Sequence, residues 1–343
     1  MPYNPFIILM KYLVTGAAGF IGMHSCLKLL KKNLSVVGID NLSNYYDVRL
    51  KRSRLKVLKK YKKFKFFKVD ITNKNLLNNI FKKFSPTHVL HFAAQPGVRY
   101  SIKNPEIYTK SNLLGFSNIL ESCRLKKIKH LVLASSSSVY GANLKFPFKE
   151  ADNVDHPISF YAATKKSNEL MAHAYSHLYN IPITCLRFFT VYGPWGRPDM
   201  SLFLFTKAIK NNSPVKMFNR GKMFRDFTYI DDIADAVYKI SKKIPTSTKK
   251  YKKEFLKPDT SFAPYRVFNI GNNKPTKLNK YISLIEEALD KKANKKYLPM
   301  QPGDLRHTHA NITNIKSYIN YKPRTNIKKG IKEFVKWYND YYR

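Results

Sequence analysis

A tyrosine and a lysine four positions apart, Tyr161 and Lys165, are the residues best suited to acid–base chemistry in this chain. They follow a short apolar run at residues 131–134 and four consecutive serines, Ser135 to Ser138. Positions i and i+4 of a helix share one face, and an ammonium beside a phenol favours the phenolate. Because parallel sheets bind ligands beyond the carboxyl ends of their strands, we expect these groups to converge on one bound molecule, with Tyr161 as the base.

Each part of this pattern also has a plain structural explanation. A Tyr-x-x-x-Lys spacing arises by chance in a chain rich in both residues, and Tyr61 and Lys65 show it without a serine-ended strand before them. A run of serines is usually a loop. The prediction therefore depends on the order of the two features, which follow a glycine-rich turn near the start of the chain.

The glycine-rich turn lies between a short strand expected at residues 12–15 and a helical run expected at residues 23–32. Its glycines, Gly16, Gly19 and Gly22, allow a tight turn and close approach of the backbone to a ligand, and the helix N-terminus receives a pyrophosphate. Such a motif is weak alone, but here its required setting of strand, turn and helix is met. The sequence therefore predicts a dinucleotide-binding turn.

An acid at the end of the second expected strand bears on the choice of dinucleotide. The strand covers residues 34–39 and ends in Asp40, eighteen positions after Gly22. A carboxylate at this place accepts hydrogen bonds from the adenine ribose, which favours NAD over NADP. The alternative is that Asp40 merely caps the end of the strand.

Strands and helices alternate through the first 190 residues, which argues for an α/β fold with a Rossmann-like, doubly wound parallel sheet. After residue 190 the chain becomes turn-rich. We therefore expect residues 1–190 to form the cofactor-binding domain, to which residues 227–243 and 264–272 return, and residues 191–343 to form mainly a smaller substrate-binding lobe. The strands expected in the sheet lie at residues 12–15, 34–39, 64–69, 89–92, 128–135, 182–188 and 266–270. The longer helices are expected at residues 105–126, 157–179, 278–289 and 327–341.

The composition suits a globular enzyme better than a nucleic-acid-binding protein. The chain has 343 residues, 44% of them hydrophobic, which is ample for a core. The net charge of +40 is compatible with a polyanionic partner. However, the lysines are spread along the whole chain, and a lysine-rich proteome explains the total better than binding of nucleic acid.

Cysteine content and hydrophobicity indicate where the protein works. Cys26, Cys123 and Cys185 are scattered and odd in number, which suits a reducing compartment, and their spacing predicts no metal site. No apolar run reaches the ~18 residues that a membrane helix needs. The N-terminus shows no basic segment or cleavage site of a signal peptide. We expect a cytoplasmic protein without a membrane span, with either Met1 or Met10 as its true start.

Three arginines in the turn-rich part, Arg197, Arg225 and Arg306, are available for an anionic ligand. Any one of them is a surface arginine by default, but three in the expected substrate lobe predict at least one anion contact. His91 lies within an apolar run, so we expect it to be a packed core residue rather than a base.

Together, Gly16-x-x-Gly19-x-x-Gly22, the serine-ended strand and Tyr161-x-x-x-Lys165 resemble the extended short-chain dehydrogenase/reductase superfamily, over nearly the whole chain. Within it, residues 93–101, 135–141 and 188–200 look like those of UDP-glucuronate 4-epimerases. The resemblance implies an isomerase that binds NAD and a UDP-sugar. It also implies a homodimer with the helices at 105–126 and 157–179 as its interface.

The resemblance also implies residue roles. Tyr161 is the base, Ser136 hydrogen-bonds the sugar 4-hydroxyl, and Lys165 holds the nicotinamide ribose and lowers the pKa of the phenol. The implied cofactor contacts are Gly16, Gly19, Phe20, Ile21, Gly22, Asp40, Asn41, Asp70, Ile71, Phe92, Ala93, Ala94, Asn112, Ser135, Tyr161 and Lys165. The implied substrate contacts are Ser136, Ser137, Ser138, Gln95 and Arg99, with Thr190 and Arg197 near the sugar carboxylate, Arg225 at a phosphate and Asp304 at the uridine ribose. Arg306 and His307 replace small or neutral residues of the family, which predicts a locally different nucleotide pocket.

The reaction implied by the resemblance begins when Tyr161 takes the proton of the sugar 4-hydroxyl while the C4 hydride moves to NAD. The flat 4-keto intermediate presents its other face, and the hydride returns with inverted configuration. Dehydratases and decarboxylases of the superfamily usually have a threonine and an acid where Ser136 to Ser138 stand, so hydroxyls alone favour epimerisation of UDP-glucuronate to UDP-galacturonate. Three alternatives stay open: a 4-epimerase of a neutral UDP-hexose or N-acetylhexosamine, a UDP-glucuronate decarboxylase, and an RNA-binding dinucleotide-fold protein without catalysis.

Overall fold

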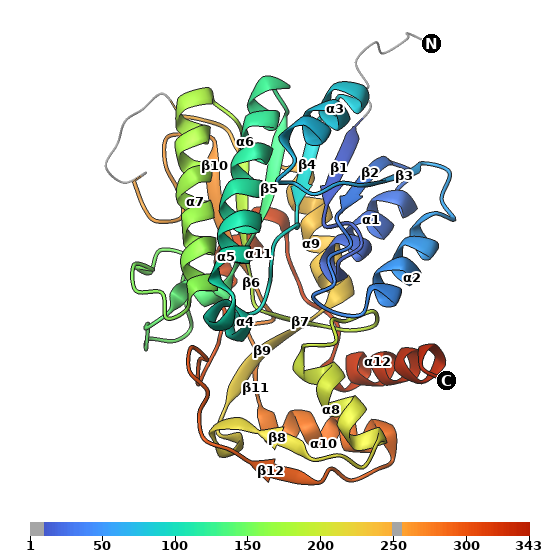
Figure 1. Ribbon diagram of the computed structural model, residues 1–343. Coiled ribbons are helices and arrows are strands. Elements are labelled where there is room, and N and C mark those ends of the chain that lie inside the picture. Colours follow the sequence, from blue (N-terminus) through green and yellow to red (C-terminus); the bar gives the residue numbers. More distant parts are fainter. Residues whose placement is uncertain (1–9, 249–255) are drawn as a thin grey trace.

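The computed structural model describes residues 10–248 and 256–343, and its centre is a seven-stranded parallel sheet (Figure 1). The strand order is β3-β2-β1-β4-β5-β6-β10, so the direction of winding reverses between β1 and β4. Ligands bind beyond the strand ends at such a reversal. The predicted fold class is confirmed. The strands are β1 (Lys11–Thr15), β2 (Ser35–Asp40), β3 (Phe64–Lys68), β4 (His88–His91), β5 (His130–Ser136), β6 (Ile183–Phe188) and β10 (Tyr265–Ile270).

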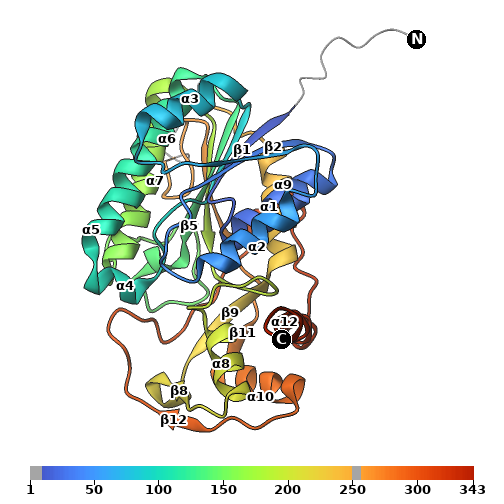
Figure 2. The same cartoon turned by 45° about the vertical axis from the view of Figure 1, so that its right-hand side comes forward.

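Helices cover both faces of this sheet, as Figure 2 shows. Successive side chains of a strand point to opposite faces, and in β1 Leu13 and Val14 pack into different hydrophobic clusters. Both faces are therefore apolar, which is typical of a parallel sheet. One face is covered by α1 (Phe20–Lys31), α2 (Val48–Leu58) and α9 (Ile230–Lys242), and the other by α3 (Lys74–Phe84), α6 (Gly115–Leu125) and α7 (Phe160–Tyr179).

A smaller layer of strands and helices lies below the carboxyl edge of the sheet in Figure 1. It contains a three-stranded sheet of β7 (Thr190–Tyr192), β9 (Phe224–Tyr229) and β11 (Pro275–Lys277), and a pair of β8 (Val215–Met217) and β12 (Lys295–Tyr297). Its helices are α8 (Ser201–Lys210), α10 (Leu278–Leu289) and α12 (Ile327–Tyr341), of which the last two confirm the predicted helices. The shorter elements of the chain are α4 (Val98–Lys103), α5 (Pro105–Tyr108), α11 (Thr313–Ile319) and the 3₁₀ turns η2 (Ser137–Tyr140) and η3 (Phe218–Gly221).

The long helix predicted at residues 105–126 is present as one continuous helical stretch over residues 105–125, but a π-helical turn lies within it. Helix α5 passes into η1 (Thr109–Leu114) before α6 begins. Within this turn the Asn112 side chain accepts a hydrogen bond from the Gln95 amide at 2.8 Å and donates one to the Thr164 hydroxyl at 3.1 Å. Such bulges occur frequently at functional sites. Here the bulge ties the helix to the segment after β4.

The helix predicted at residues 157–179 begins later, at Phe160. Ser159 has an extended backbone, and its hydroxyl accepts a hydrogen bond from the Ala162 amide at 3.1 Å. Serine is a preferred N-cap because it satisfies one of the free amides of the first turn. The cap residue lies two positions before Tyr161, so α7 begins one residue before the tyrosine.

One earlier expectation concerns residues outside the described part of the chain, because the choice between Met1 and Met10 as the start involves residues 1–9. Among the residues that are described, no helix has both the length and the apolar character needed to cross a membrane.

A buried glutamate makes the stability of this fold depend on pH. Glu150 is 1% exposed, accepts a hydrogen bond from the Asn269 amide at 2.9 Å, and shares the Asn314 amide group with Asp259. Burial raises its pKa to about 7. Since the unfolded chain releases this proton near its ordinary pKa of about 4.3, ionisation favours unfolding as pH rises from there to about 7, by roughly 3 kcal/mol in total.

We therefore expect the difference in melting temperature between Glu150→Gln and the wild-type protein to shift in favour of the variant as pH rises from about 4.5 to 7. Thermal unfolding of both proteins across this range measures the effect, and the comparison removes the contribution of all other groups. A difference in melting temperature that stays constant over the range would contradict the prediction.

Candidate active site

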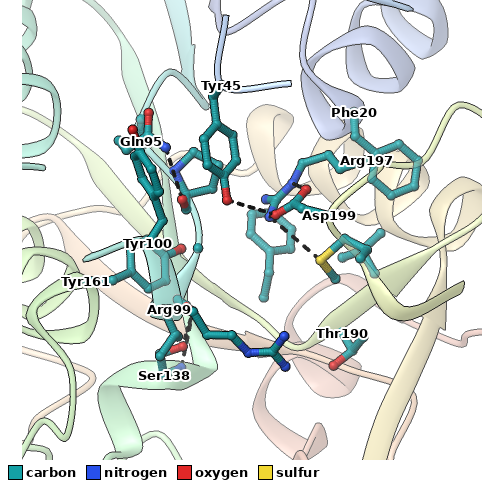
Figure 3. Close-up of a pocket in the computed structure, with 18 of the residues that line it drawn as sticks. Phe20, Tyr45, Gln95, Arg99, Tyr100, Ser138, Tyr161, Thr190, Arg197 and Asp199 are labelled. Carbon is teal, nitrogen blue, oxygen red and sulfur yellow. Dashed lines mark hydrogen bonds and ion pairs between the residues drawn. The ribbon is translucent and has the colours of Figure 1, made fainter. Parts of the chain in front are cut away.

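One cavity of about 1030 Å³ lies between the carboxyl edge of the large sheet and the smaller layer (Figure 3). Every residue for which the family resemblance implied a cofactor or substrate contact lines this cavity, with the exception of Asn112. Asn112 is 1% exposed and lies behind the wall, where it holds the backbone of Gln95. The structure therefore gives Asn112 a supporting place instead of the predicted cofactor contact.

The glycine-rich turn connects β1 to α1 at one end of the cavity. Gly16 has a φ of +69°, and a side chain at Gly22 would collide with the Gly16 carbonyl oxygen. Gly19 caps α1 without a side-chain hydrogen bond, so the first amides of the helix face no capping group. Free amides at a helix N-terminus bind phosphate groups. The turn therefore fits the pyrophosphate of a dinucleotide.

Asp40 combines the two interpretations that its sequence position allowed. Its carboxylate accepts hydrogen bonds from the amides of Leu42 at 2.8 Å and Ala18 at 3.1 Å, as a strand-end cap does. It also lines the cavity, where each oxygen keeps capacity for a further donor such as a ribose hydroxyl. Burial raises its pKa, and the charge of Lys51 opposes this effect.

Lys51, the first residue of a lysine- and arginine-rich stretch that no predicted contact includes, lines the same part of the cavity. Its side chain is 5% exposed and donates to the Ser43 hydroxyl at 2.9 Å. Leu50, Leu55 and Leu58 are also buried on α2, so Lys51 lies at the edge of the apolar face. This helical periodicity is the sequence signal that could have identified Lys51 as a residue that faces inward.

The neighbouring strand end holds Asp70 and Asn41. The Asn41 amide donates to the Asp70 carboxylate at 2.8 Å, and the Thr72 hydroxyl donates to it at 2.7 Å. Burial alone would raise the pKa of Asp70, but these hydrogen bonds outweigh it and lower the pKa. The carboxylate is therefore charged at neutral pH and faces the region where an adenosine would lie.

The serine, tyrosine and lysine meet where β5 ends and α7 begins. The Ser136 hydroxyl bonds that of Ser138 at 3.1 Å, and Lys165 donates to the Ala134 carbonyl at 2.9 Å. Burial lowers the pKa of Lys165 to about 8. Tyr161 lines the same cavity as Ser136 and Lys165, and Figure 3 shows it near Ser138.

Lys165 is not among the main influences on the pKa of the Tyr161 phenol in this structure. Burial raises the pKa of Tyr161, and the groups that oppose this rise are the hydrogen bond with Ser136 and the charge of Arg197. Sequence spacing places a lysine and a tyrosine on one helix face, but it does not reveal how far burial disfavours both charged forms.

The part of the cavity facing Tyr161 contains Thr190 and an ion pair (Figure 3). Arg197 donates to both carboxylate oxygens of Asp199, at 3.0 and 2.7 Å. Tyr45 donates to the same carboxylate at 3.1 Å. Arg197 is thus not a free cation. Asp199 and Tyr45 were missed by sequence reasoning, because no spacing relates residue 45 to residue 199.

A second ion-pair cluster lies at the expected nucleotide end. Asp304 pairs with Arg225 at 2.8 Å and with Arg99 at 3.7 Å, so the two arginines approach one another across it. Arg306 is exposed and does not line the cavity, so it is not one of the predicted anion contacts. His307 packs its ring on Phe146, with 4.3 Å between the ring centroids, and lies outside the lining as well.

Two further groups, Glu169 and His91, are buried and do not line the cavity. Glu169 lies one helical turn after Lys165, accepts a hydrogen bond from Ser135 at 2.6 Å, and binds Arg187 through two bonds of 2.9 Å. His91 is buried and bonds Thr15 at 2.8 Å, and burial lowers its pKa to about 3. This confirms that His91 is a packed core histidine.

A parallel sheet with a glycine turn at its reversal point and Ser136, Tyr161 and Lys165 beside it defines the class of short-chain dehydrogenase/reductase enzymes. The particular family follows from comparison with known proteins. The chain belongs to the NAD dependent epimerase/dehydratase family, whose model matches residues 12–271.

Similar proteins include several with a stated activity. The chain is 52% identical to Protein CapI of Staphylococcus aureus, over 97% of this chain and 100% of that one. It is 44% identical to a probable UDP-glucuronate 4-epimerase of Rhizobium meliloti (strain 1021), over 97% of this chain and 98% of that one. A crystal structure of UDP-glucuronic acid 4-epimerase from Bacillus cereus, in complex with UDP-glucuronic acid and NAD, matches with a TM-score of 0.86 and 34% identity, covering 97% of this chain and 100% of that chain.

Proposed function

We propose that this enzyme is a UDP-glucuronate 4-epimerase, which forms UDP-galacturonate through a 4-keto intermediate with NAD as its cofactor. The observation that carries the proposal is a wall of hydroxyls beside Tyr161. Ser136, Ser137 and Ser138 line the cavity, and no acid stands at these three positions. An acid here would assist elimination from a 4-keto sugar, whereas hydroxyls bind the sugar without offering that route. The stated activities of the Rhizobium and Bacillus proteins support the same substrate.

In this proposal the residues of the chain bind, orient and exchange one proton. Ser136 hydrogen-bonds the 4-hydroxyl, and Tyr161 accepts its proton and later returns it. Lys165 holds the cofactor ribose next to the phenol. When bound, NAD would supply the reversible hydride acceptor for C4 of the sugar, and the glycine turn and Lys165 would hold it. The enclosing lobe excludes water from the keto sugar.

The nucleotide would occupy the end of the cavity near Arg225. Arg225 and Arg99 both face Asp304 and are suited to a diphosphate, which arginine binds with two parallel hydrogen bonds. Asp304 would then accept hydrogen bonds from the uridine ribose. We also propose that residues 1–190, with 227–243 and 264–272, form the NAD-binding domain. The places of α9 against the sheet and β10 within it support this division.

The central experiment is to incubate the purified protein with UDP-glucuronate and NAD and to follow the sugar by proton NMR. Formation of UDP-galacturonate, without a pentose and without carbon dioxide, is the expected result. A UDP-pentose would mean that the enzyme is a decarboxylase, and an unchanged spectrum would exclude UDP-glucuronate as the substrate.

The compensated charge of Arg197 gives one reason to consider a neutral UDP-hexose as the substrate instead. If a carboxylate is recognised, Arg197→Ala should lower kcat/KM for UDP-glucuronate by about 10- to 100-fold, which corresponds to roughly 1.5–3 kcal/mol for a hydrogen bond to a charged group. Turnover of UDP-glucose, where present, should change little. Steady-state kinetics with both sugars test this, and an equal loss for both would favour a structural role for Arg197.

We further propose that the protein is a homodimer joined through α6 and α7. Leu125, Leu170 and Leu178 on these helices are 57, 59 and 67% exposed. Apolar side chains gathered on neighbouring helices are typical of an interface. Light scattering should give a dimer that becomes a monomer in Leu170→Glu/Leu178→Glu, whereas Leu144→Glu, at an 87% exposed loop position, should leave the mass unchanged. A monomeric wild-type protein would refute the interface.

A further inference from the structure

The arginine expected to meet the sugar carboxylate already has an anionic partner. Nε and Nη2 of Arg197 bind the two oxygens of Asp199 at 3.0 and 2.7 Å. Its other amino group, Nη1, makes no hydrogen bond with residues 10–248 or 256–343. Arg197 can therefore still donate hydrogen bonds to a substrate, but most of its charge is compensated by Asp199.

The carboxylate of Asp199 is in turn held by a residue from a distant loop. The Tyr45 hydroxyl donates to Oδ2 of Asp199 at 3.1 Å, and the Tyr45 ring packs on Tyr100 of α4 with 5.0 Å between centroids. A Cβ atom at Gly97 would lie 2.6 Å from the Tyr45 hydroxyl, so the segment after β4 also confines it. Figure 3 shows the line from Tyr45 through Asp199 to Arg197. Asp199 is thus fixed from two sides.

The Arg197–Asp199 ion pair differs from the Arg187–Glu169 ion pair, which lies in the core. The side chains of Arg187 and Glu169 are 0 and 3% exposed, as expected for a pair that holds the fold together. Those of Arg197 and Asp199 are 23 and 28% exposed, and both residues line the cavity. The Arg197–Asp199 pair therefore acts where a ligand binds.

An epimerase that retains its 4-keto intermediate has to release one face of the sugar and bind the other. A carboxylate held by an uncompensated arginine would be strongly bound in the starting geometry and would have to give up that interaction when the ring turns. Binding energy that is present in the ground state and lost on the way to the transition state lowers kcat. A compensated arginine avoids this penalty.

We propose that Asp199, held by Tyr45, is a positioning residue that compensates Arg197 so that the sugar carboxylate is recognised by hydrogen bonds and still released for the turn of the keto sugar. The inference depends on the proposed function, since it requires a uronate substrate. It makes Asp199 a determinant of kcat and not only of binding.

Asp199→Asn tests this inference, because the amide keeps the shape and removes the charge. In steady-state assays, KM for UDP-glucuronate should fall by roughly three- to fivefold, the size of a partly exposed ion pair. The kcat value should fall by a similar factor, so kcat/KM stays nearly constant. The same change in Arg197→Ala/Asp199→Asn should have no effect on KM relative to Arg197→Ala. A rise in KM, or an equal effect without Arg197, would overturn the inference.

A binding measurement separates this inference from the proposed function. In the Tyr161→Phe background, with NAD present, calorimetry with UDP-glucuronate and UDP-glucose should show that Asp199→Asn strengthens binding of the uronate alone. Unchanged or equally changed affinities for both sugars would overturn the inference. Failure of the wild-type enzyme to convert UDP-glucuronate would overturn the proposed function. The calorimetric result would still test whether Asp199 weakens the binding of a uronate by Arg197. Asp340→Asn, which removes the same charge from an exposed pair with Arg343 on α12, is the matched control and should leave both sugars unaffected.

Discussion

Tyr161→Phe is expected to lower kcat for the interconversion of UDP-glucuronate and UDP-galacturonate by about 10²- to 10⁴-fold, the usual contribution of a general acid–base group. The phenol lies on the cavity wall next to Ser136, and burial raises its pKa. The hydrogen bond with Ser136 and the charge of Arg197 work in the opposite direction. Removing the hydroxyl leaves no group on α7 in its place to accept the proton of the sugar 4-hydroxyl.

Binding should survive this substitution, because the ring and its packing remain. Single-turnover and steady-state kinetics measure the loss, while calorimetry with UDP-glucuronate and NAD checks that both dissociation constants stay within about threefold, less than 1 kcal/mol. Tyr297→Phe, at a 56% exposed position of β12, is the control for the loss of a phenolic hydroxyl. If Tyr161→Phe kept more than a tenth of the wild-type kcat, another base would have to be sought.

Glu169→Ala should destabilise the protein by about 3–5 kcal/mol, because it leaves the guanidinium of Arg187 buried and unpaired. Arg187 is fully buried and Glu169 nearly so, and two hydrogen bonds of 2.9 Å join them. Glu169 also accepts the Ser135 hydroxyl, which lies between the pair and the cavity. The substitution therefore removes a hydrogen bond that holds Ser135 in the cavity wall, and it also weakens the core.

Chemical denaturation followed by circular dichroism gives the change in the free energy of unfolding. Glu106→Ala removes the partner of Lys110 in an exposed ion pair and should cause no measurable loss, since such pairs are strongly screened by water. A loss below about 1 kcal/mol for Glu169→Ala would show that Arg187 finds another partner, and that the pair contributes less than its burial indicates.

Local patterns in the sequence were sufficient for the features that a single turn or helix creates. Gly19 and Gly22 both approach the Gly16 carbonyl oxygen within one turn, so neighbouring residues decide the need for glycine there, whereas Gly16 itself lies against the backbone of Phe92 and Ala93. Tyr161 and Lys165 are one helical turn apart, so periodicity alone places them together. The alternation of apolar strands and helices likewise predicted the doubly wound sheet, because both faces of a parallel sheet are buried.

Features that join distant segments could be found only in the tertiary structure. Helical periodicity places Lys51 at the edge of the apolar face of α2, but only the packing of α2 against the sheet brings this lysine to the cavity. The π-helical turn within the helix at residues 105–125 contains Asn112, whose side chain bonds Gln95 and Thr164. Neither of these bonds lies within the helix, so the helical pattern of the sequence does not predict the turn.

The electrostatics of the site belong entirely to the tertiary level. The sequence alone determined which groups can carry the chemistry: the glycine turn, the serine run, and the tyrosine and lysine of one helix face. Only the folded chain decided that burial raises the pKa of Tyr161, and that Arg197 faces Asp199 and Tyr45. The physical reason is that a pKa and an ion pair depend on the dielectric and on neighbours in space, which long-range packing of segments more than 150 residues apart creates.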